Sequence, residues 1–235
     1  MTPHKWDAVL LTGPRKRERL FELAVFLFLI VPSMCLSFLV VRQGDLGFVI
    51  TAIATILRDL ALVSLIVFFL WRNGEGKDRI GWRFRGWQDA LLGVLLFVLV
   101  FLAAGYLDQL LRAAGFSEPA TPLPKALTAQ GPAEYLLAVL LVAVVAFAEE
   151  VIFRGYMILR LTEVTGSSIA AILLSSVIFA LGHGYEGTAG VVTVGFLGLA
   201  FAIVYVWTDS LAAPIVMHFL QDFIGIVALP LIKHK

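Results

Sequence analysis

The sequence contains few charged residues and almost no cysteine. Only 15% of its 235 residues are Asp, Glu, Lys or Arg, whereas 60% belong to the apolar set AVILMFWYC. Soluble domains carry about 25% charged residues, so this composition excludes an ordinary soluble domain. The single cysteine, Cys35, excludes an internal disulfide and a cysteine-based zinc site, and it lies within an apolar block where a small hydrophobic role is expected.

What the sequence has in place of charge is a series of long apolar runs. These runs are about 20 residues long and are separated by short polar loops, which is typical of helices that cross a bilayer. We therefore predict an all-α, polytopic transmembrane helical bundle of seven or eight spans, which forms a single integral-membrane domain over residues 1–235. The predicted spans cover about 20–41, 48–71, 89–111, 133–162, 168–184, 189–208 and 210–231.

Basic residues in the loops predict the orientation of these spans. Lys and Arg gather in the N-terminal tail and again between residues 72 and 86, and two spans separate these groups. Cytoplasmic loops are enriched in Lys and Arg, so the N-terminus is predicted to be cytoplasmic. The tail shows no short apolar core that ends in a small-residue cleavage site, so we expect the first span to be a retained membrane anchor. With seven spans, Lys233 and Lys235 would lie outside, which argues for an eighth segment in the proline-rich loop after residue 112.

A small set of ionisable residues remains at membrane depth. A charge at the bilayer centre costs at least about 2.5 kcal/mol, so such residues must compensate one another or serve a function. The set consists of Arg58, Asp59, Glu149, Glu150, Arg154, His183, His218 and Asp222.

The spacing on the fourth span distinguishes its two glutamates. Glu150 and Arg154 are four residues apart, so they lie on one helical face and can form an ion pair with a purely structural role. Glu149 is rotated away from this pair and has no partner on its own helix. The short turn near residue 165 makes the fourth and fifth spans an antiparallel hairpin, which predicts His183 at nearly the same depth as Glu149. A hydrogen-bonded packing role for His183 is the alternative.

Two further pairs of polar residues remain. His218 and Asp222 are also four residues apart and project from one side of the last span, so they either bond to each other or complete a site with Glu149 and His183. Arg58 and Asp59 are adjacent and face different directions. We expect each of them to find a partner on another helix, with a structural role.

Three motifs occur in order along these hydrophobic helices: Glu149-Glu150-x-x-x-Arg154, Phe179-x-x-x-His183 and His218-x-x-x-Asp222. Together they resemble the CPBP intramembrane protease family, also called the Abi or CAAX prenyl protease type 2 family. The matched region spans residues 149–222, within a motif-bearing catalytic core of about 133–231. The resemblance implies a polytopic peptidase whose active site opens within the membrane toward the cytoplasm.

The resemblance also implies roles for individual residues. Glu149 and His183 would activate water, with Glu150, Arg154 and Phe179 in support, and His218 with Asp222 would stabilise the oxyanion. Many relatives have Asn at the last position, and a carboxylate cannot donate a hydrogen bond, so Asp222 would instead orient His218.

Two chemistries are compatible with these residues. Glu149, His183 and His218 would suffice for a catalytic zinc ion with water as fourth ligand. The family is often labelled metal-dependent, but no H-E-x-x-H spacing occurs here. We favour metal-free catalysis by glutamate over a divalent metal such as zinc.

The predicted function is therefore an intramembrane endopeptidase that hydrolyses a membrane-associated protein or peptide with a water activated by Glu and His. The alternatives are a non-proteolytic membrane scaffold and a proton-coupled transporter, because buried Glu, His, Asp and Arg also build proton relays. Expected partners are membrane lipid and the substrate, with no nucleic acid. Short loops and compact size favour a prokaryotic cell membrane, where CAAX processing is uncommon.

Overall fold

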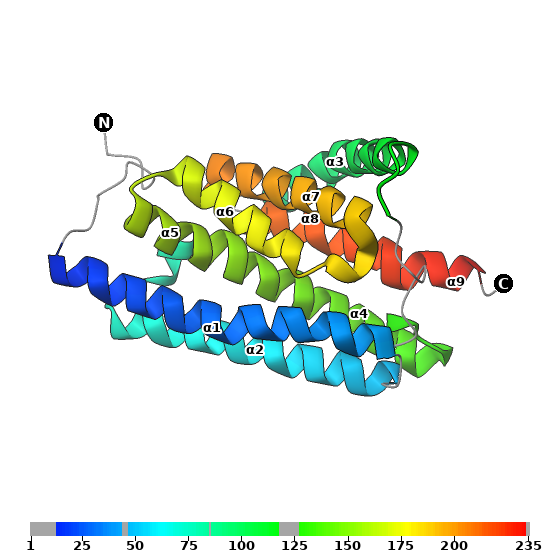
Figure 1. The fold of residues 1–235 in the computed structure, drawn as a ribbon, viewed down its shortest axis with the longest axis horizontal. Helices are drawn as coiled ribbons and strands as arrows, with labels where there is room; N and C mark the ends of the chain where they lie inside the picture. The colour runs from blue at the N-terminus through cyan, green and yellow to red at the C-terminus, as the bar shows by residue number, and fades with distance from the viewer. Residues whose placement is uncertain (1–12, 44–46, 85, 118–126, 234–235) are drawn as a thin grey trace.

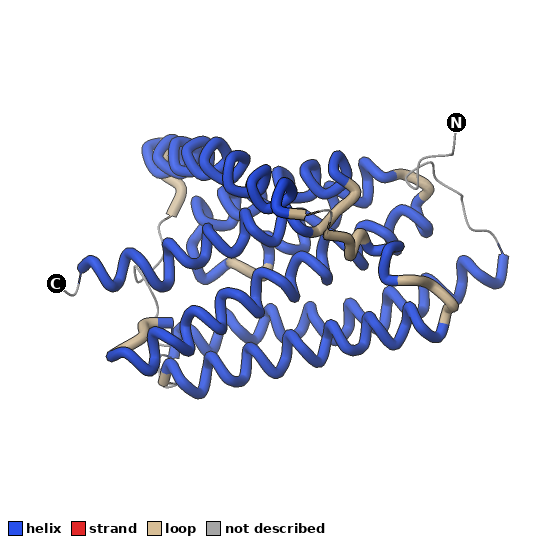
Figure 2. Tube along the Cα trace, turned by 180° about the vertical axis from the view of Figure 1, so that it is seen from behind, coloured by secondary structure: helices blue, strands red, loops and turns tan. Residues whose placement is uncertain are grey.

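The computed structural model describes residues 13–43, 47–84, 86–117 and 127–233, and in these ranges it contains helices, turns and loops but no strand (Figure 2). The α-helices are α1 (Gly13–Gln43), α2 (Phe48–Arg72), α3 (Trp87–Ala113), α4 (Gly131–Glu149), α5 (Ile158–Thr165), α6 (Ser168–Leu181), α7 (Gly187–Thr208), α8 (Ala212–Asp222) and α9 (Leu229–Lys233). Shorter elements are the 3-10 turns η1 (Lys77–Ile80) and η4 (Gly184–Glu186) and the π-helical segments η3 (Glu150–Met157) and η5 (Phe223–Ala228).

These elements confirm the predicted all-α membrane bundle. The stretches α4–η3–α5 and α8–η5–α9 are each continuous, so the described helices follow the seven predicted spans. Five of these stretches are long and apolar enough to cross a bilayer. The predicted eighth segment falls largely on residues 118–126, which lie outside the described residues.

Helix α6 is shorter than the predicted span. Its 14 residues, from Ser168 to Leu181, rise only about 21 Å, whereas a bilayer core is about 30 Å thick. Gly166 ends α5 in a left-handed conformation and the Ser167 hydroxyl caps the start of α6, which fixes the tight turn between the two helices. Because α6 starts at that turn and ends early, the chain that follows Leu181 turns back at membrane depth.

The helix that contains α4, η3 and α5 occupies the middle of the bundle (Figure 1). On one flank of it α1 contacts α5 and α2 contacts α4 and η3, and α6 and α7 cover another flank. Helix α8 packs against both α4 and α3. A Cβ atom on Gly93 of α3 would lie 2.8 Å from the carbonyl oxygen of Ala213, so glycine permits the close contact between α3 and α8.

The side chains are distributed as expected for a protein in lipid. Large apolar residues lie exposed on the outward faces, including Phe28, Leu57, Leu99, Leu136 and Ile203. Several charged residues are almost fully buried inside, including Glu22, Asp59, Glu150, Arg154 and Arg160. The protein is an integral membrane protein by its helices and composition, and its interior polar groups must therefore be satisfied by one another.

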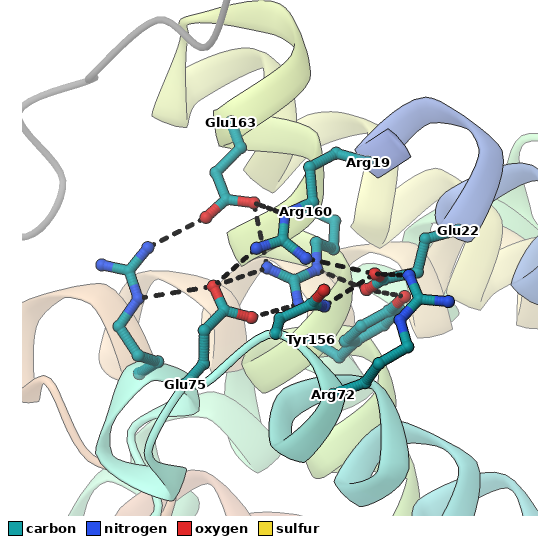
Figure 3. Close-up of polar contacts among 9 residues, drawn as sticks. Arg19, Glu22, Arg72, Glu75, Tyr156, Arg160 and Glu163 are labelled. Carbon is teal, nitrogen blue, oxygen red and sulfur yellow. Dashed lines mark hydrogen bonds and ion pairs between the residues drawn. The ribbon is translucent and has the colours of Figure 1, made fainter. Parts of the chain in front are cut away.

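Nine polar residues form the Arg160 cluster at the end of the bundle where α2 ends and α6 begins (Figure 3). The buried Arg160 guanidinium contacts Glu22 at 2.8 Å, Glu75 at 2.5 Å and Glu163 at 3.0 Å. The other members are Arg19, Arg72, Asn73, Arg79 and Tyr156, each of which contacts at least one of the three glutamates. The cluster ties α1, α2, η1 and α5 together.

Four tryptophans mark the same end of the bundle. Trp71 lies in the last turn of α2, Trp82 lies just after η1, Trp87 starts α3 and Trp207 lies near the end of α7. These segments meet, because Leu211 donates its backbone N–H to the Gly81 carbonyl at 2.9 Å. Tryptophan is enriched where a membrane meets water, which indicates that this end lies at a membrane interface.

Candidate active site

The first motif lies where the central helix changes its geometry. Glu149 is the last residue of α4, and Glu150 begins the π-helical segment η3. We expected a regular α-helix over 133–162, and the structure differs in this segment. A π-helical segment has a wider turn and is frequently found at functional sites. Gly155 lies in η3, where a Cβ atom would be only 3.0 Å from the carbonyl oxygen of Ile80. The absence of a side chain at this position lets the segment pack closely against Ile80.

Glu150 connects the first motif to the third. Its Oε1 accepts a hydrogen bond from Nη1 of Arg154 at 2.9 Å, which confirms the predicted pair on one helical face. The same oxygen lies 2.7 Å from Nδ1 of His218 on α8. Since a carboxylate can only accept, Nδ1 carries the proton and Glu150 fixes the orientation of the imidazole ring. We expected Asp222 to orient His218, and the structure gives the shorter contact to Glu150.

The other nitrogen of His218 faces two further carboxylates. His218 Nε2 lies 3.4 Å from Oδ2 of Asp222 and 3.7 Å from Oε2 of Glu149. The Glu149 side chain is 16% exposed and that of His218 is 5% exposed. Oε2 of Glu149 is nevertheless buried without a hydrogen-bond partner. Glu149 thus has no hydrogen bond at Oε2 and no partner on its own helix, as its position on the helix predicted, and His218 lies within ion-pair distance of it.

Phe179 of α6 provides an aromatic surface beneath these groups. Its ring packs edge-on against the His218 imidazole with centroids 5.9 Å apart, and the Arg154 guanidinium lies over it at 4.4 Å. Arg154 also donates to the Gly198 carbonyl of α7 at 3.2 Å. A Cβ atom on Gly198 would lie 3.0 Å from Phe179, so the missing side chain lets α7 approach the site. Phe179, a member of the second motif, therefore contacts residues of both the first and the third motif.

His183 lies at the edge of this group rather than inside a helix. Helix α6 ends at Leu181, so His183 lies in the turn before η4 and not in the predicted span over 168–184. Its Nδ1 is 3.0 Å from the Phe179 carbonyl oxygen, and its ring packs on Phe179 at 4.8 Å. Among the described residues, no hydrogen bond or ion pair joins His183 to Glu149. That Glu149 and His183 work as a pair on one water molecule therefore stays a prediction.

Arg58 and Asp59 pair with each other. Nε of Arg58 donates to Oδ1 of Asp59 at 2.9 Å, and Nη2 lies 2.8 Å from the same oxygen. Our expectation that each would find a partner on another helix was wrong. Adjacent positions on a helix face different directions, but the long Arg58 side chain reaches the carboxylate of the next residue.

The predicted zinc ligands do not converge. In the described part of the chain, no three His, Cys, Asp or Glu side chains stand close enough to hold a metal ion. His218 lies beside Glu149, but His183 is turned toward the Phe179 carbonyl. The proposed set of Glu149, His183 and His218 does not fit a metal centre in this arrangement, and no step of the mechanism is derived through one.

Sequence reasoning missed several residues that shape the site. Gly198 and Phe201 of α7 both contact Arg154. In the sequence, Gly198 lies in an apolar run without a motif, and Phe201 is indistinguishable from an ordinary core aromatic residue. The Arg160 cluster was also missed. In the sequence, the cluster was indicated only by charged residues at the ends of the predicted spans. Such residues are usually solvated at a membrane surface.

Comparison with protein families gives one match, over residues 131–224, to the model described as type II CAAX prenyl endopeptidase Rce1-like. Comparison with curated proteins and with solved structures gives no match. The matched segment runs from α4 to η5 and contains all three motifs. This segment of the chain is therefore similar to type II CAAX prenyl endopeptidases, which supports the family resemblance that the motifs predicted.

Proposed function

We propose that this protein is an intramembrane endopeptidase that cleaves a membrane-associated protein or peptide with a water molecule activated by Glu149. The observation that carries the proposal is the buried, unpartnered Oε2 of Glu149, which lies 3.7 Å from Nε2 of His218. A buried carboxylate oxygen without a hydrogen bond is costly to keep, so its retention beside an imidazole is typical of a site that binds something more.

The proposed reaction assigns one task to each group. Glu149 takes a proton from water while the water oxygen forms a bond to the carbonyl carbon of the substrate. His218 is held through Nδ1 by Glu150, and as an imidazolium, protonated on both ring nitrogens, it donates its Nε2–H to the developing oxyanion. The carbon–nitrogen bond then breaks, and the proton on Glu149 passes to the leaving nitrogen. Asp222 and Arg154 position these groups, since each contacts a member of the His218–Glu150 pair.

His183 acts from the other side of Phe179 in this proposal. Its Nδ1 is engaged with the Phe179 carbonyl oxygen, which leaves Nε2 free to hold the attacking water or a substrate group. The turn that carries His183 lies at membrane depth because α6 is short. Irregular backbone at that depth occurs only where it is buried in protein or lines a water-filled cavity. The location of His183 thus supports a role in the site.

Substrate class and orientation are also part of the proposal. The family name refers to prenylated CAAX proteins, and a lipid-anchored peptide chain is a substrate that could enter the site from the bilayer. Arg19 and Arg79 lie together in the Arg160 cluster, at the end marked by tryptophans. The rule that basic loops stay inside makes this the cytoplasmic end. The N-terminus is then cytoplasmic, in a prokaryotic cell membrane.

Cleavage of defined peptides by purified protein in lipid nanodiscs tests the proposal. The substrates are internally quenched peptides with and without a C-terminal prenylated CAAX sequence. We expect cleavage by the wild type and its loss in the Glu149→Ala and His183→Ala variants. Equal cleavage by all three proteins would end the protease interpretation. A scaffold predicts binding without cleavage, and a transporter predicts proton flux in liposomes that depends on Glu149.

A further inference from the structure

The Arg58–Asp59 pair lies on the face of α2 that contacts the central helix. Asp59 is 1% exposed. It falls on a stripe of buried α2 residues that includes Ala52, Val63 and Ile66, with the spacing of a single helical face. Helix α2 packs against α4 and η3. Asp59 therefore points into the interior between α2 and the helix that carries the two motif glutamates.

The neighbours of Asp59 on this stripe show which part of the central helix Asp59 faces. Ala52 packs in one cluster with Ala138 and Leu141 of α4. Val63 and Ile66 pack in another cluster with residues of η3 that follow Glu150. Asp59 lies between them, so it faces the last turn of α4, which ends in Glu149. Asp59 is also within electrostatic range of both Glu149 and His218.

Two acidic oxygens on these facing helices have no partner. Oδ1 of Asp59 is engaged by Arg58, while Oδ2 is buried and makes no hydrogen bond. Oε2 of Glu149 is likewise buried and makes no hydrogen bond. An unsatisfied buried acceptor is costly, and more so when it is charged, so two of them in one region require an explanation. A water molecule held between them would donate a hydrogen bond to each and satisfy both.

The exposure of Arg58 indicates that water reaches this region. Arg58 lies near the midpoint of α2, and its side chain is 42% exposed. A guanidinium at the bilayer centre is strongly disfavoured in lipid and lines a water-filled cavity or the bundle interior. The Glu149 and Asp222 side chains are also partly exposed. A polar, hydrated space between α2, α4 and α8 accounts for all three side chains.

We propose that Asp59 is a positioning residue of this active site, whose free Oδ2 accepts a hydrogen bond from the Glu149 carboxyl group once Glu149 has taken the proton of the attacking water. Asp59 itself stays ionised throughout, and the proton leaves on the amine product. Arg58 holds Oδ1 and so directs Oδ2 toward α4. The inference rests on the proposed function of Glu149 and adds a fourth helix, α2, to a site whose three motifs lie on other helices.

A graded series of variants tests it in the full-length protein in nanodiscs, with the quenched peptide that the wild type cleaves best. Asp59→Asn keeps the shape but replaces a charged acceptor by a weaker neutral one, so we expect kcat to fall about tenfold. Asp59→Leu removes the acceptor and should lower kcat about a hundredfold. Arg58→Gln releases Oδ1 only, and a loss of about threefold is expected. KM should change by less than about twofold throughout.

The controls separate positioning from stability and from failure of the proposed function. Asp78→Asn in η1 removes a carboxylate whose side chain is 59% exposed and should leave kcat and the unfolding temperature unchanged. Values of kcat within twofold of the wild type for both Asp59 variants, beside an inactive Glu149→Gln variant, overturn the inference alone. Losses of kcat that follow lowered unfolding temperatures across the series also overturn it. A wild type without cleavage, or an active Glu149→Gln variant, overturns both proposals.

Discussion

Two groups of buried charged residues lie on the same central helix, and they differ in how completely they are satisfied. In the Arg160 cluster, Glu22 accepts from Arg160, Tyr156 and Asn73, and none of the cluster's described polar atoms is buried without a partner. Around His218, in contrast, Glu149, Glu150 and Asp59 each keep one buried oxygen without a partner. A saturated network holds helices together, whereas an unsaturated one is able to bind water or substrate.

The difference follows from composition and place. The Arg160 cluster combines four arginines with three glutamates and lies at the end that we assign to a membrane interface. The His218 group combines the carboxylates of Glu149, Glu150 and Asp222 with one arginine, Arg154. Its acceptors outnumber its donors inside the bilayer, where unsatisfied polar groups are most costly. Such a balance is typical of functional sites, where stability is commonly lower than it could be.

The strongest test of this contrast is Glu149→Gln. The amide keeps the size of the side chain but cannot take a proton from water, so we expect cleavage to fall at least about a thousandfold. The unfolding temperature should stay within about 2 °C of the wild type, because no hydrogen bond of Oε2 is lost. Peptide cleavage and thermal unfolding in the same nanodiscs measure both quantities. Marked destabilisation by this variant would contradict the distinction between the two groups.

Arg160→Met is the matched variant in the saturated cluster. It leaves the carboxylates of Glu22, Glu75 and Glu163 without their shared partner. Removal of one member of a buried ion network costs about 3–5 kcal/mol of unfolding free energy. Denaturant unfolding in mixed micelles checks the value. The fraction that remains folded should keep a normal kcat, and a selective loss of kcat without destabilisation would instead assign the cluster a part in catalysis.

Gly198→Ala is expected to have an intermediate effect on the boundary of the site. The added Cβ would lie 3.0 Å from Phe179 and 3.5 Å from Nη2 of Arg154, so the ring and the guanidinium must shift. Overpacking of this kind costs about 1–3 kcal/mol. We expect a comparable loss of stability and a decrease in kcat, since both groups contact the His218–Glu150 pair. Gly105→Ala on α3, where the Cβ meets nothing within 4 Å, is the control.

Metal removal should have the smallest effect. Metal-free catalysis predicts that EDTA or 1,10-phenanthroline leaves cleavage within about twofold of the untreated protein, because the proposed chemistry uses only Glu149 and the two histidines. Metal analysis of the purified protein provides an independent measurement. If chelation abolished activity and added zinc restored it, metal-free catalysis by glutamate would be wrong and the zinc alternative would be supported.

Much of the fold and part of the site could be predicted from the sequence. Apolar runs fixed the helices, because the length of a bilayer-spanning segment is set by the thickness of the membrane. The pair of Glu150 with Arg154 followed from spacing on one helix, and so did the isolation of Glu149. These are local relations, which the geometry of a single helix decides.

Only the tertiary structure decided which helices share the site. Glu150 orients His218, His183 is turned toward the Phe179 carbonyl, and Asp59 faces the last turn of α4. These arrangements depend on how the helices pack against one another. The early end of α6 and the π-helical turn at Glu150 were likewise absent from the periodicity. Sequence specifies which groups must be buried, because lipid tolerates no other arrangement; packing between helices specifies which of them meet and which keep an oxygen free.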